Sequence, residues 1–224
     1  MNNKISIYYT IALLASLGFA SYIFSIVSST NKTIAIITSY LLVISIAMLA
    51  NLTWDSIGLS KDSLAKGFIF ALPFIATIVI GAIAVFIFNS EIFQDERYKQ
   101  GSRLVLFTIF ITIPFFTVLI EELAFRGVLF GMLQTVVSQN YAIIASSLSF
   151  GVWHVFSANG LSSAAIPQSI PKALVVLAVI VATSIAGVFF TWLRIRSGSL
   201  ITPILVHWAI NSTGVVMAYF AWQK

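Results

Sequence analysis

Residues 104–126 read LVLFTIFITIPFFTVLIEELAFR, an uncharged apolar run that ends in two glutamates and an arginine. The run up to Ile120 falls within the roughly 17–25 residues that a helix needs to cross a hydrocarbon core about 30 Å thick. Charged side chains at the end of such a run are costly in lipid unless they are paired, hydrated or close to the membrane face. This stretch therefore predicts a membrane helix with polar chemistry at one end.

Further apolar segments extend the same architecture over the whole chain. Hydrophobic residues make up 59% of the 224 residues, charged residues only 8%, and mean hydropathy is +1.02, so the chain lacks the polar surface of a soluble domain. The runs are continuous rather than alternating, which favours helices over a barrel. We therefore predict an all-α, polytopic transmembrane helical bundle with about seven to eight spans. The segments are 5–27, 34–52, 67–88, 104–120, 141–158, 173–193 and 199–221.

Two of these segments differ from a simple membrane span. The fourth resumes after the charges as GVLFGML, which predicts one long or broken helix over about 103–135 and makes an eighth, partial span. The first is long for a signal peptide, and we expect it to stay as a retained span. Polar segments at 53–66, 89–103 and 159–172 are expected at the water or the membrane interface, the last as a mobile flap.

The charge pattern limits the partners. The formal net charge is +5, but the basic residues lie at the ends of apolar runs and form no cluster. That pattern excludes nucleic acid as a partner and favours contact with membrane lipid headgroups. Basic residues on the two sides nearly balance, so no orientation in the membrane is predicted. The chain has no cysteine, which excludes disulfide and thiolate chemistry.

The acidic pair differs from the other acidic residues, because it stands at the end of an apolar helix and not in a loop. Glu122 and Arg126 are four residues apart, so they share a helix face and can form an ion pair. Glu121 lies about 100° further round the helix and can point elsewhere. A carboxylate in a pocket of low dielectric constant suits a general base. The alternative is that both glutamates anchor the helix end at the interface.

Both histidines of the chain lie in apolar segments. His154 follows Phe150 by one helical turn, and His207 precedes Asn211 by one turn. Imidazoles in spanning segments usually face the interior of the bundle or a wet cavity. A single buried histidine is more often a packing residue, but the two together with the paired glutamates favour a site.

Glu121, His154, His207 and Asn211 come from three segments and could converge on one point. Two imidazoles and a carboxylate can hold zinc and leave a position for water. The same groups could hold water directly, with Glu121 taking its proton and histidine and asparagine donating to the oxyanion. The residues leave both options open. They also leave open a proton-coupled transporter, since intramembrane Glu and His form relays, and a membrane scaffold or bacteriocin-immunity protein without catalysis.

Three motifs stand in order along the chain: Glu121-Glu-Leu-Ala-Phe-Arg126, Phe150-x-x-x-His154 and His207-x-x-x-Asn211. In this order the chain resembles the CPBP family, the CAAX-protease and bacteriocin-processing membrane proteins also called Abi proteins. The resemblance covers about residues 104–215. It implies that residues 101–224 form a CPBP-type catalytic core, preceded by N-terminal transmembrane helices at 1–100.

The resemblance implies an intramembrane endopeptidase that hydrolyses a peptide bond, with or without a metal ion. Eukaryotic members of the family act on prenylated CAAX proteins, and bacterial members are linked to peptide maturation and bacteriocin immunity. Carried over by motif, Glu121 activates water, Glu122 and Arg126 support the site, His154 and His207 are the paired imidazoles, and Asn211 is the oxyanion donor. Glu121, His154 and His207 would be the ligands of any zinc ion. The substrate would be a peptide or protein, lipid-modified in some members, and the short chain resembles the branch found in bacterial cell membranes.

Overall fold

The computed structural model describes residues 3–26, 29–99, 101–159 and 170–223. In these ranges the chain forms helices and turns without a strand. The helices before the predicted core are α1 (Asn3–Ile26), α2 (Ser29–Leu49), α3 (Trp54–Ile57) and α4 (Lys61–Phe88). Two 3₁₀ turns follow, η1 (Ser90–Phe93) and η2 (Glu96–Tyr98). The all-α prediction is confirmed.

The glutamates lie on one continuous helical run of 32 residues, Ser102–Leu133. It consists of α5 (Ser102–Phe107), η3 (Thr108–Thr112), η4 (Pro114–Val118), α6 (Leu119–Glu122), η5 (Leu123–Leu129) and α7 (Phe130–Leu133), of which η3, η4 and η5 are π-helical. The long helix expected over 103–135 is therefore confirmed. The residues after Arg126 continue this helix and form no separate eighth span.

The last third of the chain forms α8 (Gln139–Trp153), α9 (Val155–Asn159), α10 (Lys172–Ser197) and α11 (Ile201–Ala221). Six helices among the described residues are long and apolar enough to span a membrane. The segment predicted as a span at 141–158 differs, because α8 has only 15 residues and the chain turns at His154 before α9 begins. In place of the seven predicted spans, the described residues thus contain six helices long and apolar enough to span and one interrupted helix. The flap expected at 159–172 lies mostly outside the described residues.

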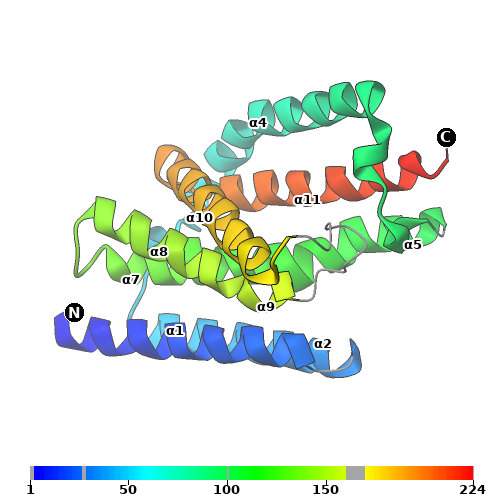
Figure 1. The fold of residues 1–224 in the computed structure, drawn as a ribbon. Helices are drawn as coiled ribbons and strands as arrows, with labels where there is room; N and C mark the ends of the chain where they lie inside the picture. Colours follow the sequence, from blue (N-terminus) through cyan, green and yellow to red (C-terminus); the bar gives the residue numbers. More distant parts are fainter. Residues whose placement is uncertain (1–2, 27–28, 100, 160–169, 224) are drawn as a thin grey trace.

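The helices surround the run that carries the glutamates (Figure 1). α1 and α2 pack side by side along one flank, α10 packs on α8, and α4 packs on α11. The most completely buried apolar side chains belong largely to this run, including Phe125, Val128, Leu129 and Met132. Apolar side chains on the outer helices are widely exposed, as expected where lipid replaces water.

Pro114 removes one backbone donor from this helix. In the π-helical turn before Pro114, the N–H of Ile113 donates to the carbonyl oxygen of Thr108, five residues earlier. The next bond of this kind would run from position 114 to the carbonyl oxygen of Ile109, but proline has no N–H to donate. Trp208 of α11 supplies the missing donor, because its Nε1 donates to the Ile109 oxygen over 2.7 Å. The contact holds α11, and with it His207, against the glutamate-bearing helix.

Small residues let α8 and α10 approach closely. A Cβ on Gly187 would lie 3.0 Å from Ser147, and a Cβ on Gly151 would overlap Ser184 and lie 2.7 Å from the carbonyl oxygen of Ile180. The backbones can be this close only because both positions lack side chains. This contact fixes the end of α8, where His154 stands.

Candidate active site

Glu122 joins two helices through one carboxylate oxygen. Its Oε1 lies 3.1 Å from Nη1 of Arg126 and 2.8 Å from Nδ1 of His207, which α11 contributes. Glu122 and Arg126 are fully buried, with no exposed side-chain surface. The ion pair expected from their spacing is confirmed.

The guanidinium of Arg126 is surrounded by aromatic faces rather than by further acceptors. Its Cζ lies 3.9 Å from the ring centroid of Phe150 and 5.1 Å from that of Phe190. Aromatic faces attract cations, and more strongly where water is excluded. Phe190 also stacks on the ring of His207 at a centroid distance of 4.7 Å. One charged pair and two phenylalanines therefore fix the plane of the His207 ring.

Glu121 is buried, with 6% of its surface exposed, and its two oxygens have different surroundings. Oε1 accepts a hydrogen bond from Nε1 of Trp153 over 2.9 Å. Oε2 is buried and has no hydrogen-bond partner. A buried carboxylate oxygen without a donor is costly, so this atom is suited to a water molecule or a substrate group.

Both histidines present Nε2 to Glu121. Nδ1 of His154 lies 2.8 Å from the carbonyl oxygen of Phe150, and Nδ1 of His207 lies 2.8 Å from Glu122. These oxygens accept, so Nδ1 carries the proton in each neutral ring and Nε2 presents a lone pair. The Nε2 atoms lie 4.0 Å from Oε1 and 3.9 Å from Oε2 of Glu121, respectively.

These separations bear on what occupies the space between the groups. They are too long for direct hydrogen bonds, while a water molecule bonded at about 2.8 Å to both atoms fits them. Zinc with bonds of about 2.0–2.2 Å and tetrahedral angles would bring its ligand atoms to roughly 3.4 Å from one another. The donor types suit zinc, but the spacing is wider, and the described residues contain no group of three in a metal-holding arrangement.

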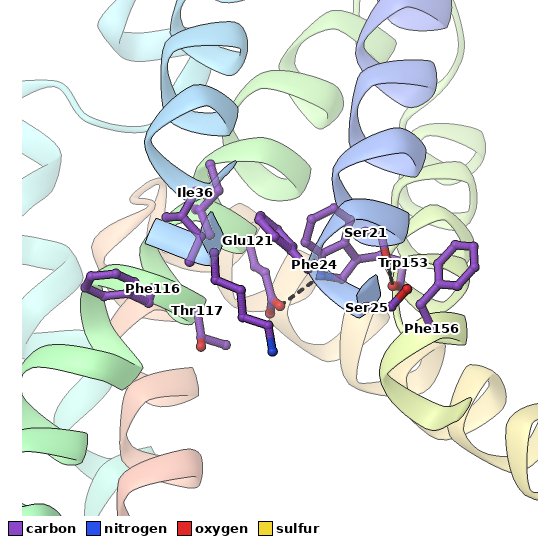
Figure 2. A pocket seen from close by; sticks show the side chains of 11 residues that line it. Ser21, Phe24, Ser25, Ile36, Phe116, Thr117, Glu121, Trp153 and Phe156 are labelled. Atoms are coloured by element: carbon purple, nitrogen blue, oxygen red, sulfur yellow. Dashed lines mark hydrogen bonds between the residues drawn. The ribbon is translucent and has the colours of Figure 1, made fainter. Parts of the chain in front are cut away.

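Glu121 lines a cavity of about 620 Å³ that opens to the exterior (Figure 2). Its wall is assembled from α1, α2, η4, α6, α8 and α9, and it combines apolar side chains, among them Phe24, Ile36, Phe116 and Phe156, with serine, threonine and charged ones. Lys32 of α2 is the one cation among the described residues that line it. Of the six predicted site residues, Glu121 alone lies on this wall, beside Trp153.

Asn211 lies outside the cluster formed by the glutamates and histidines. It is half-buried, one turn beyond His207, and it lines a second cavity of about 410 Å³ together with residues of η1 and η2. The structure thus brings together Glu121, Glu122, Arg126, His154 and His207, but gives Asn211 no hydrogen bond to them. Its oxyanion role stays a prediction.

Sequence reasoning missed three aromatic residues of the site. Trp153 bonds Glu121, Phe190 stacks on His207, and Trp208 anchors the turn before Pro114. Trp153 and Trp208 are direct sequence neighbours of the two histidines, and this adjacency was a usable signal.

Comparison with known proteins agrees with the geometry. Residues 103–213, about half of the chain, match the family described as Type II CAAX prenyl endopeptidase Rce1-like. No curated protein and no solved structure matches the chain. The matched region contains all three motifs that resemble the CPBP pattern. The chain therefore belongs to the Rce1-like family of type II CAAX prenyl endopeptidases and is an integral membrane protease.

Proposed function

We propose that this protein is an intramembrane endopeptidase in which Glu121 activates a water molecule to hydrolyse a peptide bond. The observation that carries the proposal is the buried, unpartnered Oε2 of Glu121, 3.9 Å from Nε2 of His207, on a carboxylate whose other oxygen is already bonded. An oxygen in that state is free to accept a proton from water.

The chemistry assigns a task to each group. Oε2 of Glu121 accepts a proton from the water as its oxygen attacks the peptide carbonyl, and the carboxyl later returns that proton to the leaving amine. His154 and His207 orient the water through Nε2 in the neutral state. Nδ1–H of His207 donates to Glu122, which keeps the Nε2 lone pair turned toward this water. Asn211 is the proposed donor to the oxyanion that forms on the peptide carbonyl.

Direct activation of water by Glu121 is the form of the mechanism that we propose, because the donor atoms are spaced more widely than zinc ligands. Glu121, His154 and His207 remain the ligand set for the metalloprotease alternative. We expect purified protein to lack stoichiometric zinc by plasma mass spectrometry and to keep its activity after dialysis against EDTA. Loss of activity with chelator, restored by added zinc, would establish the alternative.

The proposed substrate is a peptide or protein segment that reaches the cavity from the membrane. The apolar part of the wall and the open mouth suit an extended chain with apolar side chains. The family is named for CAAX prenyl endopeptidases, so an internally quenched peptide ending in a farnesylated CAAX sequence is the first probe. The same peptide without the farnesyl group tests whether lipid modification is required.

Replacement of the base tests the proposal. Glu121→Gln keeps the shape and the bond from Trp153 but cannot take up the proton, so we expect loss of cleavage with unchanged thermal stability. Glu91→Gln is the matched control, since Glu91 is exposed in η1, and it is expected to cleave like the parent. Comparable cleavage by Glu121→Gln and the parent in detergent would remove Glu121 as base. A cellular phenotype that persists in both Glu121→Gln and His207→Ala would instead favour the scaffold alternative.

A further inference from the structure

Trp153 is held at both its side chain and its main chain. Its indole Nε1 donates to Oε1 of Glu121 over 2.9 Å, and its carbonyl oxygen accepts from Oγ of Ser21 over 2.7 Å (Figure 2). Its ring meets Phe24 and Phe125 edge-on at centroid distances of 5.8 and 5.9 Å. Trp153 is buried, with 8% of its surface exposed, so the indole has little freedom to turn.

The fixed indole determines which oxygen of Glu121 is available. A carboxylate at the end of a flexible side chain can rotate and present either oxygen to a donor. Here the indole N–H occupies Oε1, which leaves Oε2 without a donor. Oε2 is also the oxygen that faces Nε2 of His207. The hydrogen bond from Trp153 therefore holds the base in the orientation that the proposed reaction needs.

Ser21 extends this arrangement to the first helix of the chain. The last carbonyls of a helix lack donors within that helix, and Trp153 is the last residue of α8. Ser21 lies on α1, outside the residues 103–213 that match the family. A chain of two hydrogen bonds thus connects α1 to Glu121.

We propose that Trp153 is a positioning residue for Glu121, and that α1 sets the position of Trp153 through Ser21. The proposal rests on the proposed function, because it assumes that Glu121 is the base. It assigns the N-terminal helix a role in the reaction rate that is separate from forming the cavity wall.

Removal of the indole N–H tests the first half. Trp153→Phe keeps an aromatic ring and loses the donor, and a hydrogen bond to a charged group is worth about a tenfold to hundredfold change in rate. We expect kcat on the quenched peptide to fall by that factor, with KM within about twofold of the parent. Trp192→Phe is the matched control, because Trp192 is 40% exposed on α10, and it should leave kcat unchanged.

A variant of closer shape separates donation from packing. Incorporation of 3-benzothienylalanine at position 153 replaces the N–H with sulfur and keeps the bicyclic ring. The proposal expects it to lose kcat as Trp153→Phe does, with thermal stability close to that of the parent. The variant with 3-benzothienylalanine also tests the role of the indole N–H if Trp153→Phe does not fold. Full kcat with the sulfur analogue would overturn the positioning role.

A double-mutant cycle tests the second half. Ser21→Ala removes one neutral hydrogen bond, so kcat should fall by about twofold to tenfold. Because Ser21 acts through Trp153, adding Ser21→Ala to Trp153→Phe should change kcat by less than about twofold. Ser16→Ala, which removes a bond to the carbonyl of Leu13 in the same helix, is the control for α1. Effects that multiply in the double variant would overturn the connection from α1.

These outcomes are distinguishable from failure of the proposed function. If Glu121→Gln is inactive while the variants at position 153 keep full kcat, only the positioning role is overturned. If Glu121→Gln stays active, the proposed base itself is wrong.

Discussion

The buried pair Glu122–Arg126 gives the most demanding prediction about stability. Both side chains are fully buried and their charged atoms lie 3.1 Å apart. Arg126→Met keeps a long apolar side chain against Phe150 but leaves the carboxylate of Glu122 without its cation. Breaking one side of a buried pair costs about 3–5 kcal/mol. At about 2–4 °C per kcal/mol for a chain of this length, the midpoint of thermal unfolding should fall by about 6–20 °C.

The assay is thermal unfolding in detergent, followed by tryptophan fluorescence. The double variant Glu122→Gln/Arg126→Met removes both charges, so its midpoint should recover by at least half of the loss. Arg97→Met is the matched control, because Arg97 pairs with Asp95 over 2.6 Å with 78% of its side chain exposed, and such pairs contribute about 0–1 kcal/mol. An unchanged midpoint for Arg126→Met would refute the reasoning. The reasoning would also be refuted if the double variant lowered the midpoint by the sum of the losses measured for Glu122→Gln and Arg126→Met alone.

Three further predictions concern packing, backbone satisfaction and substrate choice. Gly151→Ala should lower kcat and stability, because the added Cβ would overlap α10. Gly81→Ala is the control: its Cβ would meet no atom within 4 Å, so kcat and the unfolding midpoint should stay near those of the parent. Trp208→Phe leaves the Ile109 carbonyl without its donor and should cost about 1–3 kcal/mol in thermal unfolding. Lys32 is the one cation among the described residues of the cavity wall. Lys32→Glu reverses that charge, so kcat/KM for a peptide with an acidic residue should fall about twofold to fivefold relative to kcat/KM for a peptide with a lysine.

Much of the fold could be predicted because a bilayer imposes simple rules on the chain. A span needs roughly 20 apolar residues with satisfied backbone groups, and runs of this kind are visible in the sequence. The same rules failed at 141–158, where apolar composition predicted a full span. The chain instead turns at His154, and a turn within an apolar segment leaves no mark in hydropathy. The division into N-terminal helices at 1–100 and a core at 101–224 stays a prediction.

The candidate site was predicted in part for a similar reason. The pairing of Glu122 with Arg126 follows from their spacing on one helix, which is local geometry. The meeting of Glu121 with His154 and His207 joins groups far apart in the chain. The sequence indicated it through the cost of burying such groups in lipid and through the resemblance of its three ordered motifs to a known family. Asn211 shares a helix face with His207, yet its recorded surroundings are a second cavity, because the loop of η1 and η2 packs there.

The sequence by itself determined that this chain is a bundle of membrane helices and which ionisable residues had to find partners inside it. The length of each apolar run and the spacing of charged residues along it suffice for that, because both are properties of a single helix. Only the tertiary structure decided which atoms meet: the indole of Trp153 on Oε1 of Glu121, the imidazole of His207 on Glu122, and the hydroxyl of Ser21 on the end of α8. These contacts depend on how helices cross and where they turn, and a fraction of an ångström in that packing decides whether a hydrogen bond forms.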